Sequence, residues 1–267
     1  MKRLIAIILL LAIVFMLLLE CTNIGRYFFY DTVKINNGDT RMIAHRGSPW
    51  LKIENTDAAF EEAGQRSYFA IEADLRITAD GRFVVCHDED MDRIAGEKLL
   101  VENLTLKELL EIPLRDKFGR KCQENRLTVL ENYVKICKKY DKDCFLELKG
   151  DYTKEEILQV AEAFEKENYL HRLTIITFDR QNLINLREVL PHTPAQLLTS
   201  EVNEEIIGFL IEYDLDIALK YISFSRKTLE SLHREGICVN VWTLNNPFLA
   251  VLYRSWGVDY ITTNILE

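Results

Sequence analysis

Two histidines of this chain each follow a short apolar run, at residues 42–44 and 83–86. They are His45 and His87. Because a histidine has a pKa of about 6.5, both of its protonation states exist at neutral pH. A pair can therefore act as general base and general acid. A lone histidine at a strand end is more often structural, so the hypothesis depends on what else lies nearby.

Three carboxylates lie in other apolar runs. Glu72 and Asp74 are two positions apart within residues 69–76, so on a strand both side chains point to one face. Buried together they would repel each other, and a divalent cation removes that cost. Glu147, in residues 144–148, can supply a third oxygen ligand, and an all-oxygen set favours Ca²⁺ or Mg²⁺ over zinc. The alternative is that the pair lines a solvated strand face.

Positive charge is scarce overall but present beside these candidates. Arg46 and Lys149 each lie one or two positions from a candidate residue and can bind phosphate oxygens. The formal net charge is −9, and nucleic acid requires a basic surface, so we predict no nucleic-acid partner. An acidic protein that acts on a phosphate needs local positive charge, which a cation held by carboxylates would supply.

Strand and helix patterns alternate from residue 42 to the end. The predicted strands are 42–44, 69–76, 83–86, 144–148, 173–178, 195–198, 217–219, 237–243 and 260–262. The predicted helices are 57–64, 105–111, 127–140, 154–167, 181–190, 203–213, 227–235 and 247–256. This alternation predicts an α/β fold, a (β/α)₈ TIM barrel over residues 41–267, with its active site at the carboxyl ends of the strands. A doubly wound open sheet is the alternative, but the sequence has no Gly-rich nucleotide loop to support it.

The amino-terminal segment reads as a membrane anchor. Residues 4–19 are apolar without interruption and follow Lys2-Arg3. The run is short of the roughly 20 residues of a full span, although flanking residues extend it. We expect a transmembrane anchor at residues 1–22, a connector at 23–40 and an extracytoplasmic catalytic domain. A cleaved signal segment and lipid attachment at Cys21 are the alternatives.

The six cysteines show no C-x-x-C spacing and no dense framework. Most lie in or beside apolar runs, where small buried side chains are expected. A Cys122–Cys137 or Cys137–Cys144 disulfide stays open at this point.

A series of short motifs runs in order through residues 42–264. They are His45-Arg46-Gly47, Glu54-Asn55-Thr56 with Ala59-Phe60, Ile71-Glu72-Ala73-Asp74, Thr78-x-Asp80-Gly81, Val84-Val85-x-His87-Asp88, Glu147-Leu148-Lys149 and Val241-Trp242-Thr243-Leu244-Asn245. Together they resemble the glycerophosphodiester phosphodiesterase family. The chain departs from the family pattern at Ile53 and at Thr128-Val129, where the family usually has Pro and Pro-Thr, so substrate choice stays open.

The resemblance implies a (β/α)₈ barrel with His45 and His87 as catalytic residues. It also implies a divalent cation on Glu72, Asp74 and Glu147, with Glu54 as a further carboxylate at the metal site. Arg46 and Lys149 match phosphate-contacting positions, and Phe178 and Trp242 match positions where aromatic side chains flank the substrate. For these two aromatic residues, ordinary barrel packing is the alternative.

The expected reaction is metal-dependent hydrolysis of glycerophosphodiesters to glycerol 3-phosphate and an alcohol. The nucleophile is water or the neighbouring glycerol hydroxyl, and the sequence does not assign the acid and base roles to the two histidines. One alternative is a lysophospholipase D or a polyglycerol-phosphate phosphodiesterase at the membrane surface. Another is a catalytically silent binding barrel.

Overall fold

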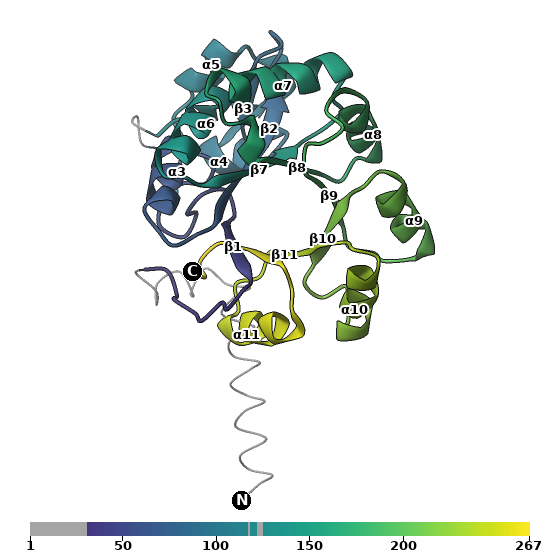
Figure 1. Ribbon diagram of the computed structural model, residues 1–267. Helices are drawn as coiled ribbons and strands as arrows, with labels where there is room; N and C mark the ends of the chain where they lie inside the picture. The colour runs from purple at the N-terminus through teal and green to yellow at the C-terminus, as the bar shows by residue number, and fades with distance from the viewer. Residues whose placement is uncertain (1–30, 117, 122–124) are drawn as a thin grey trace, which may run out of the picture.

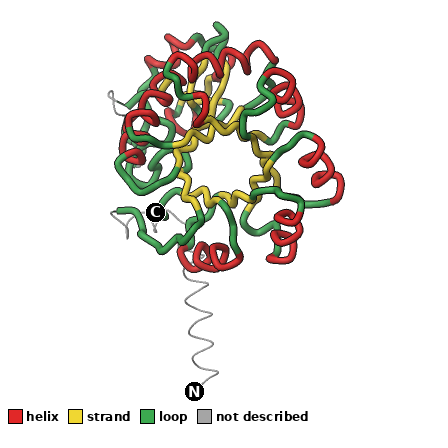
Figure 2. The backbone as a smooth tube through the Cα atoms, viewed as in Figure 1, coloured by secondary structure: helices red, strands yellow, loops and turns green. Residues whose placement is uncertain are grey.

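The computed structural model describes residues 31–116, 118–121 and 125–267, and within them eight parallel strands close into a barrel (Figures 1 and 2). The spatial order is β1-β12-β11-β10-β9-β8-β7-β2, and pairing of β1 with β2 closes the ring. The barrel strands are β1 Arg41–Ala44, β2 Ala70–Ile77, β7 Asp143–Leu148, β8 Leu173–Thr177, β9 Ala195–Thr199, β10 Asp216–Lys220, β11 Val239–Trp242 and β12 Tyr260–Thr263. The predicted TIM barrel is confirmed.

The predicted anchor at residues 1–22 lies outside the described residues, as does the connector as far as residue 30. In the described ranges no helix combines the length and the hydropathy that crossing a bilayer requires. The rest of the connector pairs with the end of the chain. Val33 forms a parallel bridge with Leu266, and the Ile35 N–H donates to the carbonyl of Glu267 over 2.7 Å.

Helices surround the strand ring and connect successive strands (Figure 1). They are α3 Asp57–Gly64, α6 Leu130–Lys139, α7 Lys154–Lys166, α8 Arg180–Val189, α9 Glu204–Glu212, α10 Arg226–Arg234 and α11 Pro247–Trp256. All except α6 begin at a polar residue whose side chain accepts a hydrogen bond from the first turn, which satisfies a backbone donor there. These caps are Thr56, Thr153, Asp179, Asn203, Ser225 and Asn246.

The strand predicted at residues 83–86 forms, but outside the barrel. β2 is the longest strand, and its last residues pair antiparallel with β3, Phe83–Val85. β3 in turn pairs with β6, Thr128–Val129. We call residues 83–129 the insertion lobe. His87 therefore follows an antiparallel strand of this lobe, not a parallel strand of the barrel.

The lobe has a small hydrophobic core of its own, around Met91, Leu109 and Leu114. Its other elements are β4 Asp90–Met91, α4 Asp92–Ala95, β5 Glu97–Leu100, the 3₁₀ helix η1 Val101–Asn103 and α5 Leu106–Glu111. A core independent of the barrel lets this segment hold side chains at fixed positions above the strand ends.

Two further apolar clusters fill the barrel domain. The larger one lies between strands and helices, and the smaller one includes Ile43, Phe145 and Ile176. The barrel strands also carry a group of hydrogen-bonded polar side chains. The side chain of Asn240 donates to Gln196, and the Thr262 hydroxyl donates to Asn240, each over 3.0 Å. Cys137 and Cys144 are buried and unbridged, so no disulfide joins them.

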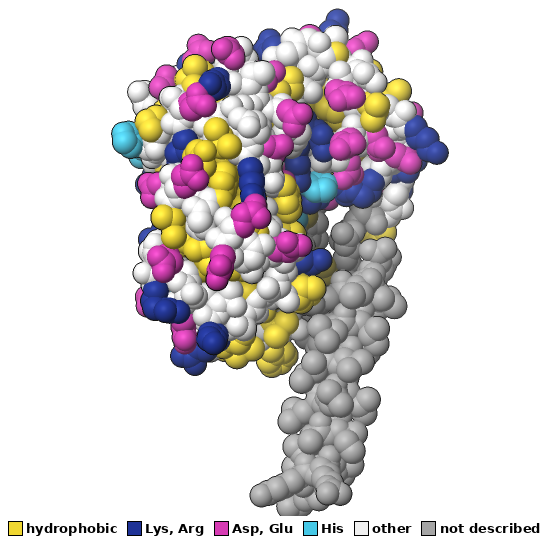
Figure 3. All heavy atoms as spheres, turned by 90° about the vertical axis from the view of Figure 1, so that its right-hand side faces the viewer, with side chains coloured by type: hydrophobic (Ala, Val, Ile, Leu, Met, Phe, Trp, Pro, Cys, Tyr) yellow, Lys and Arg dark blue, Asp and Glu magenta, His cyan; other side chains and the backbone are white. Residues whose placement is uncertain are grey.

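Charged side chains of both signs alternate over the molecular face in Figure 3, as on an ordinary solvated surface. Buried charge has a different distribution. Among the described residues the buried acidic side chains are Glu72, Asp74, Glu147 and Glu267. Three of these four lie on the adjacent strands β2 and β7, which locates the candidate site.

Candidate active site

His45 is the first residue after β1 and is fixed from both sides. Its N–H donates to the carbonyl of Thr263, and its Nδ1 lies 2.7 Å from Oδ1 of Asn264. Because an amide oxygen only accepts, Nδ1 carries the proton and Nε2 of the neutral ring is free to accept one. Burial, and then the charge of Arg46, lower the pKa of His45 to about 4. The ring is therefore neutral at pH 7.

A tight turn follows His45. Arg46 and Gly47 have φ angles of 54° and 80°, and the Arg46 N–H donates to Oε2 of Glu72 over 2.7 Å. Left-handed backbone at a residue with a side chain is strained, so its neighbours must hold it in place. Gly47 allows a close approach, since a Cβ there would lie 2.7 Å from the backbone of Ala59 in α3.

Replacing Gly47 with alanine is expected to destabilise the fold by about 2 kcal/mol, because it adds a clash to an unfavourable φ. The turn that carries His45 and Arg46 should shift with it, and activity should fall. The check is the free energy of unfolding in urea, with Gly81→Ala for comparison. A Cβ at Gly81 meets no atom within 4 Å, although its φ is also positive at 69°. An equal loss of stability in both variants would contradict the role of the close approach.

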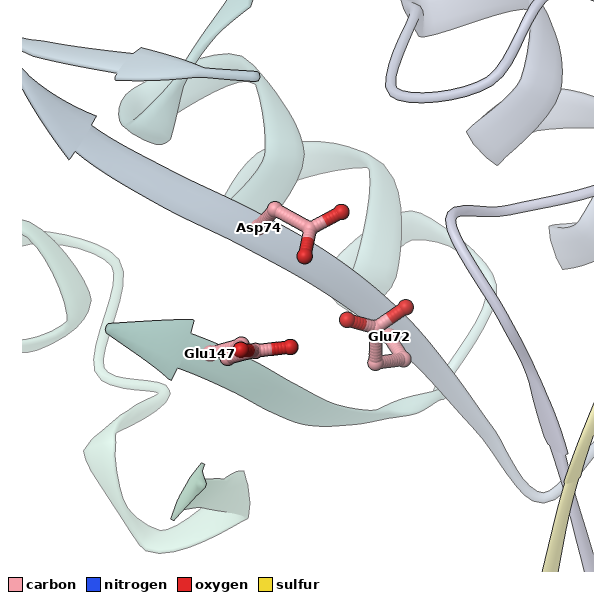
Figure 4. A group of neighbouring side chains, drawn as sticks. All are labelled: Glu72, Asp74 and Glu147. Carbon is pink, nitrogen blue, oxygen red and sulfur yellow. The ribbon is translucent and has the colours of Figure 1, made fainter. Parts of the chain in front are cut away.

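Glu72, Asp74 and Glu147 point toward one another from β2 and β7 (Figure 4). The strand register pairs Asp74 with Glu147, and Glu72 lies two positions before Asp74 on the same face. One oxygen of each carboxylate lies within 4.8 Å of the others, and all three side chains are buried. Three oxygens at this spacing could hold a divalent cation.

The protonation behaviour of the three carboxylates shows how crowded the cluster is. Burial, and then the charge of Asp74, raise the pKa of Glu72 well above its usual range and the pKa of Glu147 to about 7. Oε1 of Glu72 is buried without a hydrogen-bond partner among the described residues. A buried carboxylate oxygen without a hydrogen-bond partner fits the role of a ligand atom for a divalent cation.

Two cations and an amide surround the cluster. Lys149 Nζ lies 2.6 Å from Oε1 of Glu147 and 3.2 Å from Oδ1 of Asp74. Arg46 Nε lies 3.2 Å from Oδ2 of Asp74, which also accepts a hydrogen bond from Asn55 over 2.8 Å. These contacts outweigh burial and keep the pKa of Asp74 below its usual range.

In the metal-free protein, the contribution of Glu147 to stability is expected to fall as pH rises. The pKa of Glu147 is about 7 in the folded state against 4.5 for an unperturbed glutamate, so between these values this group binds more protons in the folded state than in the unfolded state. Its contribution to the free energy of unfolding then falls with rising pH, by a total on the order of 3 kcal/mol. His45, whose pKa is lowered from 6.5 to about 4, contributes in the opposite direction between those two values. The contribution of Asp74, whose pKa is lowered, is lost only as pH falls below 3.8.

Thermal unfolding in chelator across pH 4.5–8 measures this effect. Relative to Glu147→Gln, the unsubstituted protein should become less stable as pH rises from 4.5 to 7, because only the unsubstituted protein carries the titrating group. A stability difference between the two proteins that is constant over this range, or that changes in favour of the unsubstituted protein, would contradict the raised pKa.

His87 lies in a chain of ion pairs that the motifs alone did not reveal. Its Nδ1 is 2.7 Å from Oδ1 of Asp88, and Oδ2 of Asp88 accepts from Nε of Arg93 over 2.6 Å. The other side of Arg93 binds Glu54, with Nη1 and Nη2 at 2.9 and 2.6 Å from the two carboxylate oxygens. Glu54 also accepts from Arg46 over 2.9 Å. Both Glu54 oxygens thus face arginines, and Glu54 is not one of the three clustered carboxylates.

Most of the predicted residues line one cavity at the barrel mouth, with a volume of about 140 Å³, and Asp74 and Glu54 lie outside its lining. Of the residues singled out in the sequence, those lining it are His45, Arg46, Glu72, His87, Glu147, Lys149, Phe178 and Trp242. The rings of Phe178 and Trp242 meet edge to face, with 5.5 Å between their centroids, and Phe178 is 53% exposed. Two basic groups, two histidines and a carboxylate cluster at one cavity suit an anionic ester with a labile bond.

Sequence reasoning assigned no role to Asn55, Asp88, Arg93 or Asn264. The role of Asp88 could have been predicted from the sequence, since this residue directly follows His87. Asn264 is 219 positions from its partner His45, and Arg93 belongs to no motif.

The chain matches the glycerophosphoryl diester phosphodiesterase family over residues 45–267. It is 26% identical to a glycerophosphodiester phosphodiesterase of Caldanaerobacter subterraneus, over 84% of this chain and 94% of that protein. A shorter stretch is 35% identical to a human lysophospholipase D, over 34% of this chain and 31% of the human protein.

Among solved structures, the fold is similar to an Oleispira antarctica phosphodiesterase in complex with the product sn-glycerol-3-phosphate. The TM-score is 0.78 at 23% identity, over 84% of this chain and 92% of that one. The family match begins directly after β1 and includes the other seven barrel strands and every motif of the site described above. This chain therefore belongs to the glycerophosphoryl diester phosphodiesterase family and is a phosphoric diester hydrolase.

Proposed function

We propose that this enzyme hydrolyses glycerophosphodiesters to glycerol 3-phosphate and an alcohol, with Ca²⁺ or Mg²⁺ held by Glu72, Asp74 and Glu147. The observation that carries the proposal is a cluster of three buried carboxylates, two of which line one cavity together with both histidines. The glycerol 3-phosphate bound as product in the Oleispira antarctica enzyme supports the choice of substrate.

The chemistry of the three carboxylates supports a hard divalent cation. All their ligand atoms are oxygens, and one Glu72 oxygen is buried without a partner among the described residues. When bound, the cation supplies positive charge to the non-bridging oxygens of the phosphate. Arg46 and Lys149 hold the carboxylates in place and add positive charge beside the cavity.

The environments of the two histidines favour different roles. His45 is neutral, hydrogen-bonded to a neutral amide, and presents a free Nε2, which suits a general base that takes a proton from the nucleophile. Burial lowers the pKa of His87, but its contact with the carboxylate of Asp88 works in the opposite direction and favours the protonated ring. His45 has only a neutral amide as its partner, so the carboxylate contact makes His87 the better candidate for the general acid. His87 then donates a proton to the leaving alkoxide oxygen as its bond to phosphorus breaks.

Release of glycerol 3-phosphate from a panel of glycerophosphodiesters tests the proposal. The full chain in detergent is assayed with Ca²⁺, Mg²⁺ or chelator, beside His45→Ala. We expect release that depends on the metal and that the variant loses. A folded, metal-loaded enzyme that releases no product from any diester would overturn the proposal.

A second candidate keeps the reaction and changes the substrate to a lysophospholipid or a polyglycerol phosphate. Phe178 is largely exposed beside Trp242 at the cavity, the similar human protein is a lysophospholipase D, and residues 4–19 form an apolar segment. We propose that this segment anchors an extracytoplasmic catalytic domain to the membrane, next to such substrates. Comparison of lysophospholipids in mixed micelles with small diesters separates the two candidates.

A further inference from the structure

Arg93 is a lobe residue whose guanidinium binds two carboxylates from separate parts of the chain. Nε donates to Asp88, which follows β3, and the two terminal nitrogens donate to Glu54, in the loop between β1 and α3. Arg93 lies on α4, whose neighbours Ile94 and Ala95 are buried in the core of the lobe. The lobe therefore fixes the position from which Arg93 reaches the barrel mouth.

Each of these carboxylates uses another contact to hold a residue of the active site. Asp88 contacts Nδ1 of His87 through Oδ1 while it accepts from Arg93 through Oδ2. Glu54 accepts from Nη1 of Arg46 over 2.9 Å. A single arginine thus lies between the partner of His87 and the partner of Arg46.

We propose that Arg93 is a positioning residue that fixes Asp88 against His87 and Glu54 against Arg46, and so ties the proton donor to the phosphate-binding arginine. This inference rests on the proposed function. Arginine suits this position because its guanidinium is planar and can donate to two carboxylates at once, one along each edge. Lysine has a single ammonium and cannot reproduce both edges.

The alternative is an ordinary surface ion pair, since the Arg93 side chain is 50% exposed. Exposed pairs contribute little to stability. The two partners are less exposed, at 18% for Glu54 and 22% for Asp88, and both contact residues that line the catalytic cavity. The effect of Arg93 should therefore appear in catalysis more than in stability.

The leaving group separates positioning of His87 from a general loss of structure. Glycerophosphocholine has an alkoxide leaving group that needs a proton as the P–O bond breaks. Glycerophospho-p-nitrophenol has an aryloxide leaving group that departs without one. If Arg93 acts through Asp88 on His87, its loss should slow the first substrate far more than the second.

The experiment compares kcat and KM for both substrates in the unsubstituted enzyme, Arg93→Ala and Arg93→Lys. Arg120→Ala is the matched control, because Arg120 is a lobe arginine whose ion pair among the described residues is with Asp116, at 2.8 Å, outside the catalytic cavity. We expect Arg93→Ala to lower kcat for glycerophosphocholine by about 10- to 100-fold. The loss for the aryl substrate should be several-fold smaller, with partial recovery in Arg93→Lys and no change in Arg120→Ala.

A double substitution tests the path of the effect. If Arg93 acts through Asp88, the variant Asp88→Asn with Arg93→Ala should lose little more kcat for glycerophosphocholine than Asp88→Asn alone. Near-normal kcat in Arg93→Ala, or equal losses on both substrates together with a lowered Tm, would overturn the inference. An unsubstituted enzyme inactive on both diesters would instead overturn the proposed function, so the two failures are distinguishable.

Discussion

Replacing His45 with alanine is expected to lower kcat by about 10²- to 10⁴-fold on any glycerophosphodiester, while the fold persists. His45 is neutral at pH 7 and lines the cavity, so its loss removes the group that we propose deprotonates the nucleophile. Activation of the nucleophile is needed whatever the leaving group. The loss should therefore be similar for alkyl and aryl diesters.

His87→Ala should lower kcat as strongly for alkyl diesters but much less for an aryl diester. The ring of His87 contacts Asp88 and lines the cavity, as a donor to the leaving oxygen requires. Side-by-side kinetics on both substrates measure the contrast between the two histidines. His192→Ala is the control, because this exposed histidine lies away from the cavity. Near-normal turnover in either cavity variant would remove that histidine from the mechanism, and reversed leaving-group patterns would exchange the two roles.

The barrel could be predicted because its signals are local. Each outer helix is a short amphipathic pattern, and most begin at a capping side chain that the sequence displays. The shared face of Glu72 and Asp74 likewise follows from the period of a single strand. Features of this kind depend on neighbours within a few positions.

What sequence reasoning missed depends on pairing between distant segments. Residues 83–86 have the composition of a strand, but composition does not tell whether a strand pairs parallel or antiparallel. The extra length of β2 beyond the barrel decides it, since the last residues of β2 pair with β3 there. For the same reason Arg93 was not found, because only the lobe brings it to Asp88 and Glu54.

Glu54 shows how a motif can locate a residue without describing its surroundings. The resemblance implied a carboxylate at the metal site, and Glu54 does lie close to it, bound to Arg46. Yet its oxygens also face Arg93, and burial is outweighed by these two cations, so the pKa of Glu54 is lowered. This placement suits a carboxylate that orients Arg46, and direct binding of the cation by Glu54 stays a prediction.

Glu72→Gln and Asp74→Asn are expected to weaken binding of the divalent cation by at least about 10-fold and to abolish most activity. Each removes one of the three clustered carboxylates without a large change of shape. Titration of Ca²⁺ or Mg²⁺ by calorimetry, with the rise of Tm on metal addition, measures the loss. Glu61→Gln is the control, because Glu61 is paired with Lys139 at the surface.

The same two variants should change the stability of the metal-free protein in opposite directions. The pKa of Glu72 is raised, so at neutral pH its burial works against folding, and glutamine should raise Tm in chelator. The pKa of Asp74 is lowered by Arg46 and Lys149, so asparagine removes one of the two carboxylate partners of each of these cations and should lower Tm. Changes of Tm with the same sign in both variants would contradict the assignment of Glu72 as the carboxylate that destabilises the metal-free fold and of Asp74 as the carboxylate that stabilises it. Opposite shifts, together with lost metal binding in both, would show that this site gives up stability in its empty state in order to hold a cation.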